Sequence, residues 1–495
     1  MNKLHNHLLR FLLNCPKQEN KILPKIAYST HEQEFSNYAI VIHASDFFTK
    51  NYGNKHSLPT LPLPTIENIP FFYGTSQIER QGNTIIIHAD LIASAFVLLT
   101  RYEEWVQPDQ RDKHGRFLAK HSIACKSGFL HRPVIDEYGA LLRKCLREVG
   151  IDVPEPQQQF SKIYLTHDVD FLTRYGSLRG FCGAVWRSLG IRKNVTRESI
   201  KNTKFAKKTF VSLWDNEITH AIKSLRNPQN DPFFTFPWIL RKNAELQKQL
   251  PNQEIETIIF LKSTSANFVR HCGLDPQSHV NREEMLKQVQ HDRNHHDRPF
   301  YSLTSKAARQ LISLITNSAA IGLHTSYAAS ENPALIAKEK QELETACNAK
   351  ITHNRNHFLR SQNPTDMDFL IKNGILHDFT LGYADCAGFR LGTCRPVHYI
   401  NVETKEVSNL ILHPLLIMDC TLSDERYMNL NENQALDYAA LLIDTAKKYN
   451  GEIVLLWHNQ VFAETEKFNH RDLYAKILEY IMSVSGGNGG VIVEQ

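Results

Sequence analysis

Residues 162–170 read KIYLTHDVD, a short apolar run that ends in two aspartates separated by one residue. The run has the length and the branched and aromatic side chains of a buried strand, and polar residues begin where the strand should end. Six later segments repeat this pattern, and helical segments such as 304–317, 333–348 and 433–449 fit between most of them. The predicted strands are 257–263, 320–326, 350–358, 375–383, 410–419 and 452–458.

Near-continuous apolar strands that alternate with helices are typical of parallel strands buried on both faces. Polar residues gather at the C-terminal end of nearly every predicted strand, as they do in a parallel barrel, where the strand-to-helix loops converge. An open doubly wound sheet would also place a site there, but it would draw residues from fewer strands. The pattern favours an α/β barrel over residues 160–485.

Residues 1–150 are predicted to form a separate, smaller α/β domain. A strand at 83–88 precedes a helix over 90–105, with Asp90 placed to cap it, and the Pro-containing linker 153–156 follows the domain. Two excursions interrupt the barrel. The first, at 175–250, is mostly helical, and the second, at 270–296, is polar and predicts a surface insertion. Its histidines and cysteine could bind a metal, but a solvated loop is the simpler interpretation.

The composition is that of a soluble globular protein and excludes a disordered or disulfide-stapled chain. The 495 residues are 42% hydrophobic and 22% charged, and 57 Lys and Arg against 52 Asp and Glu give a net charge of only +5. This charge does not predict a nucleic-acid partner. The nine cysteines include no C-x-x-C pair, and no segment resembles a signal peptide or a membrane span. We therefore expect a cytoplasmic protein.

The D-x-D at the end of the first barrel strand is the first candidate for chemistry. Alternate residues of a strand share a face, so Asp168 and Asp170 should point the same way. Two close carboxylates raise each other's pKa unless a cation lies between them, and a metal ion would supply that cation. Two turn or cap carboxylates are the structural alternative. His324 also ends an apolar strand and could be a zinc ligand, with a structural histidine as the alternative. His458 follows a wholly apolar strand and is a candidate acid or base.

Several linked motifs resemble the polysaccharide deacetylase family, the NodB homology domain of carbohydrate esterase family four. They are LTHDVD (165–170), GLHTSY (322–327), RNHFLR (355–360), LGYADCAGFRLGTCRP (381–396) and LLWHN (455–459). Three further stretches resemble the uncharacterised N-terminal domain of a bacterial branch of that family. These are DLIASAFVLLTRYEEW (90–105), DKHGRF (112–117) and RPVIDEY (132–138).

The resemblance implies a distorted (β/α)7 barrel and a metal-dependent hydrolase that removes N- or O-acetyl groups from a carbohydrate. The implied cofactor is a divalent metal, zinc first, with cobalt or nickel as alternatives. Asp168 matches the family's base, Asp170 and His324 its metal ligands, and His458 the acid that protonates the leaving group. Arg355 lies at the motif that helps line the groove. Asp419 is expected to orient His458, with Asp378 and Asp385 as rivals.

One position departs from the family pattern. A second metal-binding histidine is expected four residues after His324, where this chain has Ala328. His167, His357 or His458 could complete the ligand set. We place His167 with the metal ligands. Tyr327, His357 and Arg390 are grouped as substrate-binding candidates, although Arg390 could equally brace its loop.

The gap at Ala328, together with the large N-terminal domain, keeps other functions open. A catalytically silent barrel that binds sugar or acts as a scaffold is the main alternative. A metal amidohydrolase that cleaves a C–N bond other than an acetamide is a third.

Overall fold

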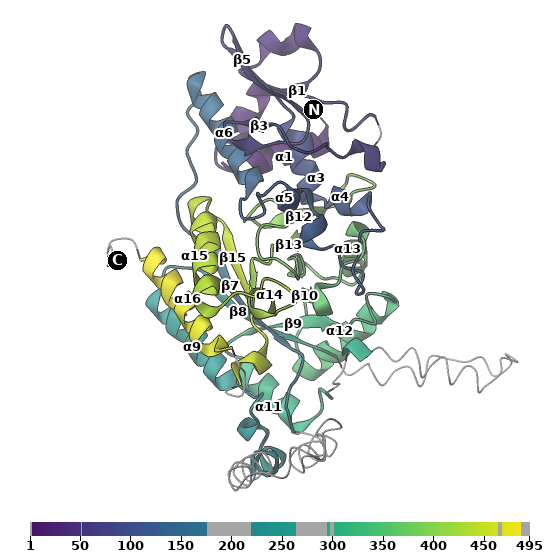
Figure 1. The fold of residues 1–495 in the computed structure, drawn as a ribbon, viewed down its shortest axis with the longest axis vertical. Coiled ribbons are helices and arrows are strands. Elements are labelled where there is room, and N and C mark those ends of the chain that lie inside the picture. Colours follow the sequence, from purple (N-terminus) through teal and green to yellow (C-terminus); the bar gives the residue numbers. More distant parts are fainter. Residues whose placement is uncertain are drawn as a thin grey trace, which may run out of the picture.

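The computed structural model describes residues 2–50, 52–175, 219–263, 295–297, 301–463 and 468–486. A smaller N-terminal region lies at one end of the molecule, and a larger region built around a curled sheet occupies the rest (Figure 1). Much of the predicted excursion at 175–250 and nearly all of the predicted insertion at 270–296 lie outside the described residues.

The N-terminal region contains a four-stranded sheet in the order β1 (Ile26–Ser29), β2 (Ile40–His43), β6 (Thr84–Ala89) and β5 (Gly74–Gln81). The strands β1, β2 and β6 are parallel, whereas β5 is antiparallel to β6. Asp90 caps the following helix by accepting a hydrogen bond from the backbone of Ala93 at 2.8 Å, as predicted. The predicted single helix is interrupted, because Arg101 adopts a left-handed backbone conformation with φ 57°.

The other elements of this region are short apart from three helices. They are α1 (Lys3–Leu13), α2 (Glu19–Ile22), α3 (Leu91–Leu99), α4 (Tyr102–Trp105), α5 (Ile123–Lys126), α6 (Val134–Glu148) and a small hairpin of β3 (Thr65–Ile66) and β4 (Ile69–Pro70).

The larger region is built on a nine-stranded sheet in the order β12-β13-β11-β10-β9-β8-β7-β15-β14. Neighbouring strands are parallel except for the pair β12 and β13. The strands are β7 (Lys162–Val169), β8 (Ile255–Leu261), β9 (Ala320–Thr325), β10 (His353–Asn356), β11 (His377–Asp378), β12 (Val397–Ile400), β13 (Val407–Leu412), β14 (Ile417–Met418) and β15 (Glu452–Leu456).

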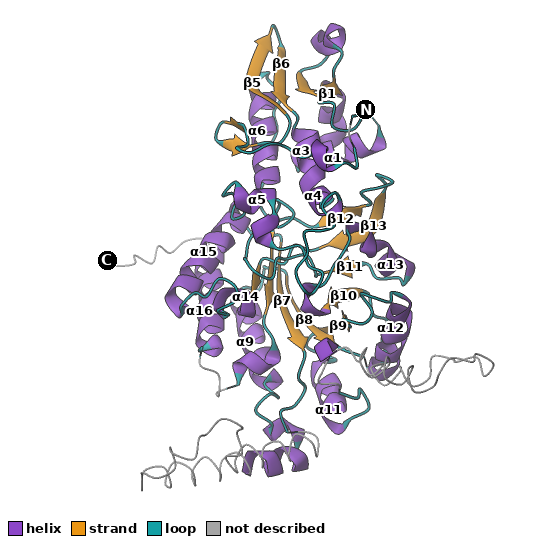
Figure 2. Ribbon diagram, turned by 45° about the vertical axis from the view of Figure 1, so that its right-hand side comes forward, coloured by secondary structure: helices purple, strands orange, loops and turns teal. Residues whose placement is uncertain are grey.

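Helices flank this sheet on both sides of the view in Figure 2. The helices of the larger region are α9 (Phe236–Gln249), α11 (Lys306–Ile315), α12 (Ala334–Cys347), α13 (Met367–Lys372), α14 (Asp419–Ser423), α15 (Glu432–Lys448) and α16 (His470–Ser485). Within the described part of the chain, no helix has both the length and the apolar character needed to cross a membrane.

The two faces of the strands belong to two separate hydrophobic cores. Ile163 and Leu165 of β7 pack in the large core, whereas Tyr164 between them belongs to a second, smaller cluster. That cluster also contains Phe260, Phe379, Leu415, Met418, Val454 and Leu456. Met418 lies on β14 at one edge of the sheet, whereas Phe379 directly follows β11 near the other edge, so the sheet curls around this cluster into a half-barrel.

The predicted strand 410–419 is two strands in the structure. β13 pairs with β11 at one end of the sheet, and β14 pairs with β15 at the other. Pro414 lies between them and has no backbone N–H to donate, which interrupts the ladder. The backbone of Leu415 donates to Leu381 and that of Leu416 donates to Val454, so this segment changes partners across the curl. The antiparallel strand β12 is a further addition that the pattern did not predict.

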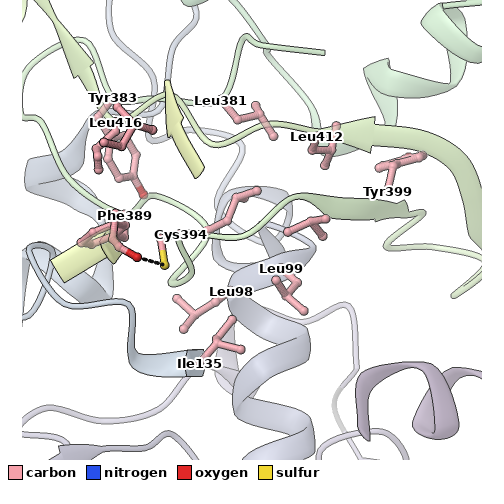
Figure 3. Packing of buried hydrophobic residues seen from close by; sticks show 14 of the residues in the cluster. Leu98, Leu99, Ile135, Leu381, Tyr383, Phe389, Cys394, Tyr399, Leu412 and Leu416 are labelled. Atoms are coloured by element: carbon pink, nitrogen blue, oxygen red, sulfur yellow. Dashed lines mark hydrogen bonds between the residues drawn. The ribbon is translucent and has the colours of Figure 1, made fainter. Parts of the chain in front are cut away.

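The N-terminal region and the curled sheet share one continuous core. Leu98 and Leu99 of α3 and Ile135 of α6 lie against the loop and strands that include Cys394 and Leu412 (Figure 3). The chain passes close to α3 at Gly392, whose φ is 67° and where a Cβ atom would lie 2.6 Å from the side chain of Leu98. Close packing without a side chain at this position joins the two regions directly.

Candidate metal centre

The polar residues at the strand ends converge on one site. Asp168 and Asp170 lie at the end of β7, Lys262 follows β8, and His324 lies on β9. The sheet register pairs Val169 with Leu261 and Leu261 with Leu323, so the next residues along these strands form a single row. That row is Asp170, Lys262 and His324. His357 follows β10 and His458 follows β15, both at the same edge of the sheet.

Asp170, His324 and His357 form a group whose ligand atoms all lie within 4.8 Å of one another. Oδ1 of Asp170 is 3.4 Å from Nε2 of His324 and 3.1 Å from Nε2 of His357. Among the described residues, neither this carboxylate oxygen nor Nε2 of His324 has a hydrogen-bond partner, although both are buried. Buried polar atoms are rarely left unsatisfied, so their convergence fits an ion between them.

The second ring nitrogen of each histidine is held by the protein. Nδ1 of His324 lies 2.9 Å from the backbone oxygen of Arg355, and Nδ1 of His357 lies 3.1 Å from Oδ1 of Asp297. Asp297 in turn accepts hydrogen bonds from the backbone of Tyr327 and Ala328. Such outer contacts fix the ring orientation and direct both Nε2 atoms toward Asp170. Two imidazoles and one carboxylate suit zinc, cobalt or nickel.

The environment of Asp170 keeps its carboxylate charged. Burial alone would raise the pKa of Asp170, but His357 and Lys262 facing it hold that pKa well below its ordinary value. An ionised carboxylate is the form that binds a cation.

Asp168 is held by Arg355 rather than by the candidate ligands. Nη1 of Arg355 donates to Oδ1 of Asp168 at 3.0 Å and to Oγ1 of Thr166 at 2.7 Å. The guanidinium carbon of Arg355 lies 4.6 Å from the centroid of the Phe260 ring, and the arginine is fully buried. The second oxygen of Asp168 lies 3.8 Å from Nε2 of His324. Arg355 therefore positions Asp168 from inside the curl, and it does not line a groove.

His458 is paired with Asp419 at the neighbouring strand. Nδ1 of His458 is 2.9 Å from Oδ1 of Asp419, and the backbone N–H of His458 donates to Oδ2 at 2.7 Å. Burial would raise the pKa of Asp419, but His458 lowers it to about 2. Burial would lower the pKa of His458, but Asp419 raises it well above its ordinary value. Nε2 of His458 lies 3.7 Å from Oδ2 of Asp170, so the imidazole faces the metal group.

The rival carboxylates have other partners. Asp378 accepts hydrogen bonds from Asn354 and Thr380, and Asp385 accepts from the backbone of Ala119.

Cys420 lies next to the His458–Asp419 pair. Together with these two residues it forms a second group whose possible ligand atoms all lie within 4.8 Å of one another.

The assignment of His167 as a metal ligand is wrong. Its neighbours Thr166 and Asp168 point into the curl, so the alternation of the strand turns His167 toward the helices. Its Nδ1 lies 3.0 Å from the backbone oxygen of Trp457, and its Nε2 lies 3.1 Å from the side-chain nitrogen of Asn243. Burial lowers the pKa of this histidine to about 4. His357, grouped with the substrate-binding candidates, lies in the metal group instead.

Arg390 and Tyr327 are also engaged inside the protein. Arg390 donates to both carboxylate oxygens of Glu104 at 2.9 Å and is 5% exposed, so it braces the loop rather than binding a substrate. Tyr327 is 4% exposed, and the guanidinium carbon of Arg360 lies 4.1 Å from its ring centroid. Neither side chain is available to a substrate in this structure.

Two residues of the site were missed by the sequence analysis. Lys262 ends an apolar strand, which is the same signal that marked His324 and His458, and it could have been found. Asp297 follows a polar stretch with no periodicity, and nothing in the local sequence indicates that it is buried at 4% exposure.

Comparisons with known proteins place only part of the chain. Residues 1–150 match a family of unknown function (DUF7033). No curated protein matches the chain. Among solved structures, it is similar to a protein from Mycobacterium smegmatis assigned as a polysaccharide deacetylase, with 12% identity and a TM-score of 0.35 over 68% of this chain and 87% of that one. It is also similar to Puue allantoinase, with 10% identity and a TM-score of 0.33 over 67% and 88% of the two chains.

Proposed function

We propose that this protein is a metal-dependent hydrolase that removes acetyl groups from a carbohydrate. The observation that carries the proposal is the convergence of Asp170, His324 and His357 beside the Asp168–Arg355 and His458–Asp419 pairs. We further infer that the curled sheet is a distorted (β/α)7 barrel in which residues 407–418 serve as one interrupted strand. Zinc is the expected ion, with cobalt or nickel able to replace it.

Asp170, His324 and His357 would hold the ion, which supplies Lewis acidity and lowers the pKa of a bound water. Asp168 is the base that accepts a proton from the attacking water, and Arg355 keeps its carboxylate aimed at that position. His458 is the acid that donates a proton from Nε2 to the departing amine or alkoxide. Asp419 holds the opposite nitrogen of that ring and keeps the imidazole protonated.

The substrate class rests on the sequence motifs rather than on the geometry. The ordered Asp, His, Arg and His motifs resemble those of carbohydrate deacetylases, which favours an acetylated sugar as the substrate. The alternative, a catalytically silent barrel that binds sugar or acts as a scaffold, rests on Ala328 together with the large N-terminal domain. His357 provides a third candidate donor and weakens the part of that alternative that rests on Ala328.

The proposal is tested by loading the full chain with zinc or cobalt and measuring acetate release from acetylated amino sugars and sugar esters. We expect release by the wild type and none by Asp168→Asn, with the same amount of bound metal in both proteins. His324→Ala should lose the metal as well as the activity. Metal-loaded protein that releases no acetate from any of these sugars would refute deacetylation.

A further inference from the structure

A lysine that the proposed chemistry does not use points into the metal centre. Along β8, Phe260 belongs to the inner cluster and Leu261 to the outer core, so Lys262 faces inward again. The lysine is 5% exposed, and its Nζ lies 3.6 Å from Oδ1 of Asp170. Within the described part of the chain, this buried ammonium makes no hydrogen bond.

A buried lysine without a hydrogen bond needs a partner for its charge. Asp170 is its nearest carboxylate, yet the same oxygen is the one that faces His324 and His357. An ion held by these three ligands would take that oxygen, and Lys262 would then be left beside a cation.

The charge balance of the site also indicates that Lys262 lacks an anionic partner once an ion is bound. Asp168 is already paired with Arg355, and Asp170 is already compensated by Lys262. A divalent ion therefore brings positive charge that these two carboxylates, together with Asp297 behind His357, do not fully balance. A buried site with excess positive charge attracts an anion, since an uncompensated charge is costly where water is excluded.

We propose that Lys262 and the metal together form a binding site for an anionic oxygen, and that this site accepts a carboxylate such as acetate. The inference rests on the proposed metal centre and adds a residue to it. Acetate is the acid released by deacetylation, and its carboxylate carries the same kind of negative oxygen that forms on the acyl carbon during hydrolysis. Lys262 would contact that oxygen directly.

The test uses the full chain loaded with cobalt, whose visible absorption reports changes around the ion. Acetate is titrated into the wild type, Lys262→Met and Lys262→Arg, and the amount of bound cobalt is measured in each protein. Lys306→Met is the matched control, because it removes the same charge from an exposed position at the start of α11. Lys262→Gln replaces Lys262→Met if the latter does not fold.

We expect Lys262→Met to bind cobalt at least as tightly as the wild type, because a like charge has been removed. Its dissociation constant for acetate should nevertheless rise by about tenfold or more. Lys262→Arg should recover part of that loss, and Lys306→Met should match the wild type. A lysine that only neutralised Asp170 would change cobalt affinity and leave acetate affinity as it was.

Two failures are distinguishable. Equal acetate affinities in cobalt-loaded wild type and Lys262→Met would overturn this inference and leave the metal centre standing. A wild type that takes up no cobalt would overturn the metal centre and the role of Lys262 with it.

Discussion

His357 is the third candidate ligand of the proposed metal centre, beside Asp170 and His324. It lies between Asp170 and Asp297, and its ring has no freedom to turn away without breaking the contact at Nδ1. We expect His357→Ala to weaken zinc or cobalt binding by about 10- to 100-fold or more, as loss of a ligand or its support does. Elemental analysis and a competition titration with a chelator measure this.

The matched control is His167→Ala. His167 is equally buried and belongs to the strand that carries both aspartates, but it contacts Trp457 and Asn243. Its loss leaves a small cavity and unsatisfied polar groups, so thermal unfolding should show a destabilisation of about 1–3 kcal/mol. Metal affinity should stay at the wild-type level. A His167→Ala protein that loses its metal would contradict the placement of this ring.

Asp419 decides whether His458 can act as an acid. Asp419→Asn keeps the size of the side chain but removes the charge that holds the ring protonated. We expect the rate of acetate release to fall by about 10²–10⁴-fold, the usual contribution of general acid catalysis, while the bound metal stays unchanged. Asp385→Asn is the control, because Asp385 lies apart from His458 and accepts hydrogen bonds from the backbone of Ala119 and Lys120. Loss of metal in Asp419→Asn would instead make this residue part of the ligand set.

At the scale of elements, the opposite edge of the sheet carries a cluster of histidines. Nδ1 of His377 on β11 lies 3.0 Å from Nε2 of His413. The ring of His377 also stacks on that of His353 of β10, with 4.9 Å between the ring centroids. Glu452 lies 2.7 Å from His413, Glu256 lies 4.0 Å from His353, and Lys162 binds Glu256. The cluster therefore has two nearby carboxylates for its three histidine rings, and Lys162 already pairs with one of those carboxylates.

This cluster should make the stability depend on pH. Burial, then His353 and His413, lower the pKa of His377 to about 4, against about 6.5 in an unfolded chain. Between these values the unfolded state binds more protons, so the free energy of unfolding falls as the pH drops from about 6.5 to about 4. His377→Gln should reduce this loss by about 1 kcal/mol, after allowance for partial exposure. Denaturant titrations at pH 7 and pH 4.5 measure it.

His31→Gln is the control for that experiment, because His31 is exposed on the N-terminal region. It should leave the slope of stability against pH as it is in the wild type. An identical slope in His377→Gln and the wild type would show that the histidine cluster does not set the acid limit.

The strands show which elements a single sequence can predict. β7, β8, β9 and β15 follow apolar runs with a clear end, and all four were predicted within a few residues. β11 is only two residues long. The break between β13 and β14 depends on the backbone oxygens of Leu381 and Val454, which accept hydrogen bonds from the two residues that follow Pro414. Those partners are far apart in the chain, so local patterns cannot specify them. The same limit hid Asp297, whose role depends on backbone groups near residue 328.

At the scale of the whole molecule, the sequence predicted two units and said little about how they meet. The contact is a shared core, with buried ion pairs inside it. Glu104 of α4 binds Arg101 of its own region and Arg390 of the larger region, with the three side chains 1% to 3% exposed. Burial would raise the pKa of Glu104, but the two arginines hold that pKa below its ordinary value. The family-like motifs 90–105 and 381–396 thus meet each other across this contact.

We therefore expect the two regions to unfold together, and Glu104→Gln to weaken both. The substitution leaves two buried guanidinium groups without their carboxylate, which costs about 3–5 kcal/mol. Glu67→Gln is the matched control, since Glu67 and Lys144 form an ion pair whose side chains are 46% and 49% exposed. Its free energy of unfolding should change by no more than about 0.5 kcal/mol.

Calorimetry and pulse proteolysis with fragments assigned to residues 1–150 and 160–485 follow each region separately. A single transition that moves to lower temperature in Glu104→Gln agrees with one cooperative unit. Separate transitions, with only one of them shifted, would show that the N-terminal region is an independent domain attached to the larger region.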